Sequence, residues 1–179
     1  DRARAARARA IEQLDVHLRQ FATAAEARGC AVHWAETAED ARRIVTEIAR
    51  ARGIRNAVKS KSMVSEEIGL NHALESAGIR VVETDLGEWV VQVAGDQPSH
   101  IITPIIHLGR DDVATLFRER LGARPEDVAD IPAMTAFARR RLRAEFLQAG
   151  MGISGANFAV AETGTICLVT NEGNGRLTT

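Results

Sequence analysis

The chain has few cysteines and no long apolar run. Its two cysteines, Cys30 and Cys167, each lie within an apolar run. This placement favours two small buried hydrophobic side chains over a disulfide or a metal site. No apolar run reaches the roughly 18 residues that a membrane-spanning helix needs, and the arginine-rich start lacks the apolar segment of a signal peptide. We therefore expect no membrane span and, by default, a cytoplasmic location.

An excess of charge of one sign is also missing. The 23 Lys and Arg residues nearly balance the 24 Asp and Glu residues, so the formal net charge is -1. Such a chain has no global field to collect nucleic acid or an anionic membrane, and a charged ligand would need a local cluster. With 45% hydrophobic and 26% charged residues, the composition is typical of one domain with a sizeable core. We expect a single domain over residues 1–179.

Arginines are concentrated in two segments that have helical character. They occur at positions 2, 4, 7 and 9 and again at positions 139–141 and 143. Each set is typical of a solvated helix face. The alternatives are a basic arm for a partner or nucleic acid at the first segment and a docking surface for an acidic partner at the second.

Lysine is scarce, and the only two lysines, Lys59 and Lys61, are two positions apart. Their isolation among arginines suggests that this position needs a compact ammonium group. They lie between a predicted strand and a predicted helix N-terminus, a junction at which open α/β sheets bind anions. We expect both lysines, with the hydroxyls of Ser60 and Ser62, to neutralise and hold an anionic ligand.

Hydrophobic periodicity and turn residues predict alternating helices and strands. The expected helices are residues 1–28, 37–53, 65–78, 111–121 and 132–148. The expected strands are residues 30–34, 56–59, 79–83, 88–94, 158–161 and 165–169, of which the last two form a hairpin. This order predicts an α/β domain with three layers and a mostly parallel sheet that ends in an antiparallel part.

A second polar segment follows the last predicted strand. It consists of Asn171, Glu172, Gly173, Asn174, Gly175 and Arg176. Polar groups gathered at a strand end usually serve a ligand. We expect Arg176 to clamp a carboxylate, the two amides and the glycine N–H groups to orient it, and Glu162 or Glu172 to act as a general base if burial raises its pKa. This hypothesis requires the lysines and Arg176 to converge on one cavity.

Other polar side chains have a simpler interpretation. Glu83, Asp85 and Glu88 surround a predicted turn, where solvated carboxylates are common. His100 and His107 could be ligands, but a histidine beside apolar residues is more often a core or edge group, and no third ligand lies at metal spacing.

Several motifs between residues 59 and 176 resemble those of a known family. They are Lys59-Ser60-Lys61-Ser62-Met63 with Ser65-Glu66-Glu67-Ile68-Gly69-Leu70-Asn71, Glu83-Thr84-Asp85-Leu86-Gly87-Glu88, Pro98-Ser99-His100-Ile101, and the stretch from Gly155 to Arg176. In this order they resemble the lactate utilisation protein B family and cover most of its LUD domain. The resemblance implies a fold like that of the ribose-5-phosphate isomerase and CoA-transferase group. It also implies a subunit of an L-lactate dehydrogenase (oxidoreductase) complex that converts L-lactate to pyruvate and passes electrons through two 4Fe-4S clusters.

The sequence departs from that family in its cysteines. The family's clusters lie in a C-terminal ferredoxin-like region with closely spaced cysteines, and Cys30 and Cys167 cannot hold a cluster. We therefore expect no cofactor in this segment, and a longer polypeptide that carries the clusters, because the chain ends where another strand is expected to begin. The expected partners are other subunits of a lactate oxidation complex and a small carboxylate or phosphate-bearing ligand. The alternatives are a subunit-docking module without a ligand, and a stand-alone isomerase or acyl transferase of the same fold group.

Overall fold

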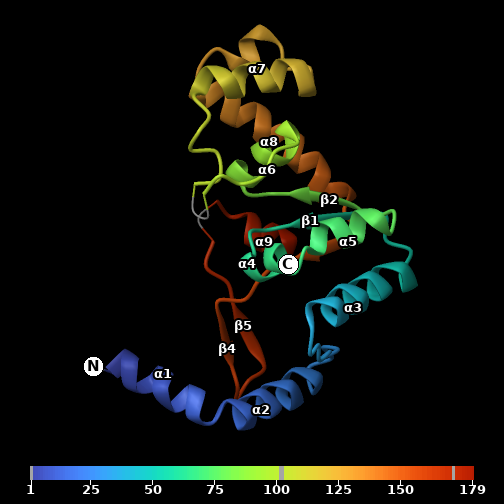
Figure 1. Cartoon of the computed structure of the whole chain (residues 1–179), viewed down its shortest axis with the longest axis vertical. Helices are drawn as coiled ribbons and strands as arrows, with labels where there is room; N and C mark the ends of the chain where they lie inside the picture. Colours follow the sequence, from blue (N-terminus) through green and yellow to red (C-terminus); the bar gives the residue numbers. More distant parts are fainter. Residues whose placement is uncertain (1, 101–102, 171) are drawn as a thin grey trace. The chain divides into compact units, whose positions relative to one another are not determined.

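A computed structural model describes residues 2–100, 103–170 and 172–179. The chain divides into two compact units (Figure 1). One, the hairpin unit, comprises Asp1–Thr37 and Ala156–Val169, and the other, the sheet unit, comprises Ala38–Gly155 and Thr170–Thr179. Whether all 179 residues fold as one domain stays a prediction.

The sheet unit is built on three parallel strands. These are β1 (Asn56–Lys59), β2 (Arg80–Glu83) and β3 (Met151–Ile153), in the order β2-β1-β3. The register pairs Lys59 with Glu83 on one side and with Ile153 on the other. The α/β class and the parallel sheet are confirmed. The sequence predicted β1 and β2, whereas β3 was missed.

Helices cover both faces of this sheet. They are α3 (Ala38–Ala51), α4 (Met63–Glu67), α5 (Leu70–Ser76), α6 (Leu86–Ala94), α7 (Arg110–Leu121), α8 (Ile131–Gln148) and α9 (Asn174–Thr178), with a 3-10 turn, η1 (Pro125–Val128), before α8. Val58 and Val82 pack against α6, α7 and α8, whereas Ala57 and Val81 pack against α3 and α5. Figure 1 shows these two groups of helices on opposite faces of the sheet. Successive strand residues point to opposite faces, so the unit has three layers.

The expected strand over residues 88–94 is wrong, because this segment is helix α6. Four consecutive residues, from Glu88 to Val91, are buried, and a short buried run rich in valine does not distinguish a strand from a helix. The helix begins after Asp85 and ends at Gly95, whose φ of +70° is a common helix stop. The helix expected over residues 65–78 is also divided, into α4 and α5, at Gly69.

The hairpin unit contains helices α1 (Arg2–Glu12) and α2 (Leu14–Glu26) and the antiparallel strands β4 (Phe158–Val160) and β5 (Thr165–Cys167). The predicted hairpin is confirmed, but it forms a two-stranded sheet of its own, so the expectation that it ends the parallel sheet is wrong. The predicted first helix is interrupted at Gln13. Gly164 lies in the hairpin turn with a φ of +66°, and a Cβ there would lie 2.3 Å from the backbone nitrogen of Ala25. The turn therefore packs directly on α2.

Four further expectations are wrong. Residues 30–34 form no strand, and Cys30 and Cys167 are exposed free thiols rather than buried side chains. Strand β5 is exposed along its length, so the polar segment does not follow a buried strand. The last residues belong to the short helix α9 instead of a new strand. Among the described helices, none is long and apolar enough to cross a membrane.

Candidate functional site

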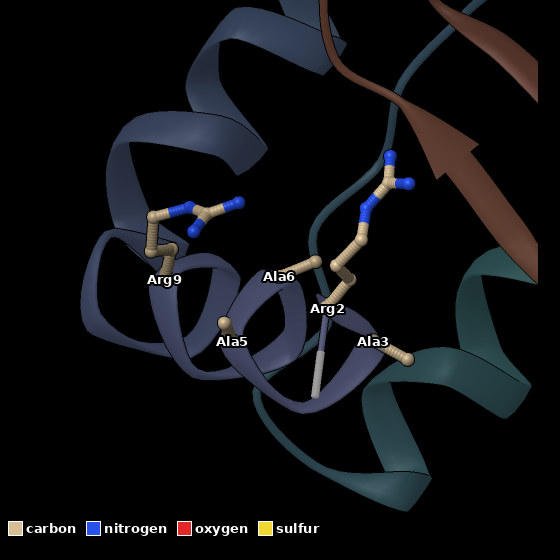
Figure 2. A pocket seen from close by; sticks show the side chains of 5 residues that line it. All are labelled: Arg2, Ala3, Ala5, Ala6 and Arg9. Carbon is tan, nitrogen blue, oxygen red and sulfur yellow. The ribbon is translucent and has the colours of Figure 1, made fainter.

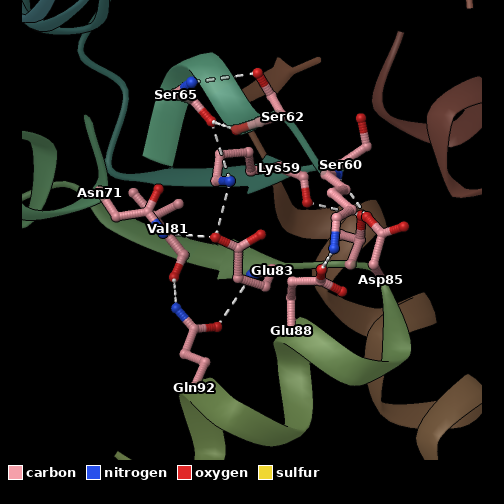
Figure 3. A network of polar contacts seen from close by, with 12 residues as sticks. Lys59, Ser60, Ser62, Ser65, Asn71, Val81, Glu83, Asp85, Glu88 and Gln92 are labelled. Atoms are coloured by element: carbon pink, nitrogen blue, oxygen red, sulfur yellow. Dashed lines mark hydrogen bonds and ion pairs between the residues drawn. The ribbon is translucent and has the colours of Figure 1, made fainter. Parts of the chain in front are cut away.

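A fully buried lysine lies at the carboxyl end of the parallel sheet. Lys59, the last residue of β1, is 0% exposed, and its Nζ lies 3.0 Å from Oε1 of Glu83 and 3.2 Å from Oγ of Ser65 (Figure 3). Glu83 is the last residue of β2 and the register partner of Lys59. Parallel pairing thus brings the two charges together. Such a pair costs desolvation energy that its attraction offsets only with good geometry.

Glu83 is held from several sides, yet one of its oxygens has no partner. Asn71 donates to the same Oε1 at 2.6 Å, and the Glu83 backbone N–H donates to Oε1 of Gln92 at 3.0 Å. Within the described chain, Glu83 Oε2 and Asn71 Oδ1 are buried and accept no hydrogen bond. Burial raises the pKa of Glu83, although the charge of Lys59 opposes this change.

The second lysine is paired as well, but closer to solvent. The ammonium group of Lys61 forms an ion pair with Glu88, and the side chains are 29% and 8% exposed. The backbone N–H of Lys61 donates to the carboxylate of Asp85. Glu83 and Glu88 are buried, so the expectation of solvated carboxylates around this turn is wrong for both.

The loop hydroxyls already take part in structural hydrogen bonds. Ser62 caps α4, since its Oγ accepts from the backbone N–H of Ser65 at 3.3 Å. The Oγ of Ser65 donates in turn to the carbonyl oxygen of Ser62 at 2.7 Å. Ser60 donates to the hydroxyl of Ser154 at 2.8 Å, which connects the loop to the residue after β3. These bonds fix the course of the loop that carries both lysines.

Hydrogen bonds also join the C-terminal segment to the end of β1. Asn174 donates to Oγ1 of Thr84 at 3.3 Å, and Thr84 donates to the carbonyl oxygen of Lys59 at 2.8 Å. Thr170 donates to Oδ1 of Asn174 at 2.9 Å and accepts from the N–H of Gly175 at 3.3 Å. Two of the predicted site residues, Asn174 and Gly175, are therefore buried in the same bonded region as Lys59.

Glu172 reaches the start of α6. Its Oε2 accepts from the backbone N–H of Leu86 at 3.1 Å, a favourable place for a negative charge. Partial burial nevertheless raises the pKa of Glu172, and the negative charges of Asp85 and Glu88 act in the same direction. Gly173 precedes α9 with a φ of +78°.

Two further predicted site residues stand outside these bonds. Arg176 is exposed, and no ion pair or side-chain hydrogen bond connects its guanidinium to another described residue. Glu162 is exposed in the β4–β5 turn and belongs to the hairpin unit. Asn171 lies outside the described residues.

Other places in the described chain offer less for a ligand. A hollow along α1 is lined by Arg2, Ala3, Ala5, Ala6 and Arg9 (Figure 2). All five are exposed residues of one helix, so the hollow is the space between neighbouring side chains. Over residues 2–100, 103–170 and 172–179, no group of three or more His, Cys, Asp and Glu side chains is placed to hold a metal ion.

Comparison with known proteins supports the family suggested by the motifs. A family model described as LUD domain matches residues 18–179. The chain belongs to the LUD domain family. It is 48% identical, over its full length, to the "Uncharacterized electron transport protein YkgF" of Escherichia coli (strain K12). It is 47% identical, over 93% of its length, to "Lactate utilization protein B 2" of Bacillus mycoides (strain KBAB4) and to "Lactate utilization protein B" of Bacillus cereus (strain AH820).

The LUD domain described here covers only part of these relatives. It spans 37% of the Escherichia coli protein and 35% of each Bacillus protein. No solved structure matches the chain.

The electrostatics of the LUD domain limit how an anion could bind. Two ammonium groups, those of Lys59 and Lys61, lie among four carboxyl groups, which belong to Glu83, Asp85, Glu88 and Glu172. Each lysine already has a carboxylate partner, so an anionic ligand would have to compete with it. Lys61 is the more exposed of the two and the more open to exchange. The role of the lysines in anion binding, and their convergence with Arg176 on one cavity, stay predictions.

Sequence reasoning missed Glu83 and Asn71. Both residues stand in motifs that resemble the family, and Glu83 also ends a predicted strand that is parallel to the strand ending at Lys59. Neither signal indicated that the two side chains meet, because the contact of Asn71 with Glu83 depends on how α5 packs against the sheet.

Proposed function

We propose that this LUD domain serves L-lactate utilisation as the ligand-binding, non-redox part of a protein that oxidises L-lactate to pyruvate. Two similar proteins are named lactate utilization protein B, and a third is named an electron transport protein. In this proposal the electrons leave through 4Fe-4S clusters bound outside these 179 residues, within a cytoplasmic complex of several subunits. The proposed fold relationship is to the ribose-5-phosphate isomerase and CoA-transferase group.

The observation that carries the proposal is the buried Lys59–Glu83 pair at the carboxyl ends of two adjacent parallel strands. Ligands of open α/β sheets bind at this edge. Buried ion pairs contribute little net stability, and strongly perturbed ionisable groups gather at functional sites. A pair of this kind at this edge therefore favours a ligand site over a purely structural one.

The proposed ligand is a small carboxylate or a phosphate-bearing compound. Its anionic group would take the place of Glu88 at Lys61, and the exposed guanidinium of Arg176 would supply a second, bidentate contact. The amides and glycine N–H groups of the C-terminal segment would orient it. In this arrangement Lys59 holds Glu83 in position rather than touching the ligand.

The test uses the full-length protein that carries this domain, with its clusters in place. Lys61→Ala and Arg176→Ala should each raise the KM for L-lactate in lactate-dependent reduction of an artificial electron acceptor, while the absorption of the clusters stays unchanged. Arg143→Ala, an exposed arginine on α8, is the matched control. Unchanged kinetics in both variants, with normal folding, would remove these two cations from the site.

A second candidate function is a subunit-docking module. Large apolar side chains are exposed in the hairpin unit, among them Ile11, Leu14, Phe158 and Ile166, and exposed apolar surface marks interaction sites. A module that only docks predicts no heat in calorimetry with lactate, pyruvate, or phosphorylated or CoA compounds. Heat with the last two groups but not with lactate would instead favour an isomerase or acyl transferase.

A further inference from the structure

The second carboxyl oxygen of Glu83 is, with Oδ1 of Asn71, one of two buried polar atoms of the site that have no hydrogen-bond partner in the described chain. The side chain is 8% exposed, and its Oε1 accepts from both Lys59 and Asn71, whereas Oε2 has no hydrogen-bond partner in the described chain. In Figure 3 this oxygen turns away from Asn71, towards the side on which Glu88 lies. A buried acceptor left without a donor is costly, so it calls for a donor that the described protein does not supply.

The bonds around Glu83 restrict its movement. The Lys59 ammonium and the Asn71 amide hold Oε1, and the backbone N–H of Glu83 is bonded to Gln92, whose own amide donates to the carbonyl oxygen of Val81 at 2.8 Å. Four elements, β1, β2, α5 and α6, thus restrict the position of Oε1 and of the Glu83 backbone. A restrained carboxylate leaves Oε2 in a defined place, where it can only accept hydrogen bonds while it is ionised.

We infer that Glu83 is a specificity-determining residue, whose Oε2 accepts a hydrogen bond from the hydroxyl group of a small 2-hydroxy acid while the ligand's carboxylate replaces Glu88 at Lys61. This inference rests on the proposed function. In a 2-hydroxy acid the hydroxyl and the carboxylate are on adjacent atoms. Glu88 lies one helical turn before Gln92, which accepts from the backbone N–H of Glu83, so a carboxylate that replaces Glu88 at Lys61 brings the hydroxyl to the side of Glu83 that faces α6. Neither Glu162 nor Glu172 is needed for this contact.

The chemistry of Oε2 separates a 2-hydroxy acid from the corresponding 2-oxo acid. An ionised carboxylate only accepts hydrogen bonds, so it pairs with a hydroxyl and repels a carbonyl oxygen. A protonated carboxyl can donate to a carbonyl oxygen. The site therefore prefers lactate to pyruvate when Glu83 is ionised and loses that preference when Glu83 carries a proton.

The surroundings of Glu83 raise the pH at which it gains or loses its proton above the usual range of a carboxyl group. Burial raises the pKa of Glu83, and the negative charge of Glu66 on α4 adds to the effect, whereas Lys59 on β1 opposes it. From the side of α6, Glu88 is neutralised by Lys61. Exchange of Glu88 for a ligand carboxylate keeps one negative charge at Lys61.

The test is calorimetric titration of the full-length protein with L-lactate, pyruvate and propionate, at about pH 5 and about pH 8. Wild type should bind lactate about tenfold or more tightly than pyruvate or propionate at the higher pH, because a site built to pair with a hydroxyl rejects analogues without one. The ratio of lactate to pyruvate affinity should fall at the lower pH.

Two variants and one control assign this effect to Glu83. Glu83→Gln should remove both the preference for lactate over pyruvate and its pH dependence, since an amide can donate as well as accept. Glu83→Asp keeps a counter-charge for Lys59 but withdraws the oxygen by one methylene, so it should lose the preference even if Glu83→Gln folds poorly. Glu88→Gln, equally buried, should change the affinities for both acids by the same factor.

The outcomes separate the inference from the function on which it rests. Lactate binding with a ratio that depends neither on pH nor on Glu83 would overturn the role of Glu83 and leave the proposed ligand site standing. Absence of heat with all three acids would overturn both.

Discussion

The sheet unit and the hairpin unit differ in what they bury. The sheet unit encloses aromatic side chains, such as Trp89 and Phe117 with ring centres 5.5 Å apart, and the charged pair Lys59–Glu83. Among the described residues of the hairpin unit, only Ala22 and Ala25 are buried. Regular secondary structure is thus present in both, but only the sheet unit has the core needed to hold ionised groups out of water in a fixed geometry.

The comparison explains where the chemistry is expected. A functional site needs side chains whose positions are fixed by surrounding packing and hydrogen bonds. The carboxyl end of the parallel sheet provides this for Lys59, Glu83 and Asn71. The exposed strands β4 and β5 provide apolar surface instead. Stability should follow the same division, with larger losses from changes in the sheet unit than from changes in the hairpin unit.

The largest effect is expected from Lys59→Met in the sheet unit. The change leaves the Glu83 carboxylate buried without its cation, and the free energy of unfolding should fall by about 3–5 kcal/mol. Urea denaturation followed by the fluorescence of the buried Trp89, in a Trp34→Phe background, measures this unit.

Lys61→Met is the matched control, and it should cost less than Lys59→Met, because the Lys61 side chain is 29% exposed and water can take its place beside Glu88. The double variant Lys59→Met with Glu83→Leu should be more stable than Lys59→Met alone, since it removes the unpaired charge. Equal losses in the two single lysine variants would show that burial does not distinguish the two pairs.

The next largest effect is expected at Gly152 in β3. A Cβ at this position would lie 1.6 Å from the carbonyl oxygen of Thr178, so α9 packs against bare backbone. Gly152→Ala should reduce the free energy of unfolding by about 1–3 kcal/mol or more, because strand and helix must separate. Gly150→Ala is the control, since its Cβ would meet the end of the Ile54 side chain at 2.9 Å, which can move. An unchanged free energy of unfolding in Gly152→Ala would contradict this packing.

Much of the fold could be predicted from local sequence. The strands β1 and β2, the hairpin, and helices α7 and α8 were predicted within one or two residues of their bounds, because turn residues and apolar periodicity mark their ends. Helix α6 was mistaken for a strand because its buried face is set by packing on the sheet. Strand β3 is only three residues long and contains a glycine, so it gave no signal.

Less of the candidate site could be predicted. The scarcity of lysine drew attention to Lys59 and Lys61, but their partners Glu83 and Glu88 are determined by the parallel register of β1 and β2 and by the position of α6. A local sequence pattern determines neither the register of the two strands nor the position of the helix. Burial separates Glu83 from an ordinary turn carboxylate, and burial follows from the assembled fold.

A smaller, pH-dependent effect is expected from Glu172→Gln. The pKa of Glu172 is raised in the folded chain, so its contribution to stability is fully present below the unfolded pKa, about 4.5, and is lost as the pH rises through the folded pKa. The variant keeps an acceptor for Leu86 but cannot ionise. It should match wild type at low pH and become slightly more stable above that range. Parallel curves of unfolding free energy against pH, measured by urea denaturation, would contradict the raised pKa.

The smallest effect on stability is expected from Phe158→Ser and Ile166→Ser in the hairpin unit. Phe158 is 65% exposed and Ile166 is 51% exposed. In the β4–β5 register Ile166 pairs with Ala159, the strand neighbour of Phe158, so the two side chains lie on opposite faces of the ribbon. If neither face is covered, each change should alter the free energy of unfolding by no more than about 0.5 kcal/mol.

Gly164→Ala is the contrasting variant within the same unit, because its Cβ would meet the backbone of Ala25 and should release the hairpin from α2. Urea denaturation in a Trp89→Phe background, where Trp34 reports on this unit, measures all three variants. A loss of about 2 kcal/mol or more from Phe158→Ser alone would show that one face is covered in solution, whereas losses from both serine variants would show a partner enclosing the ribbon. Sedimentation of wild type and Phe158→Ser would then distinguish a second copy of the chain, which the variant would release, from burial within a single chain.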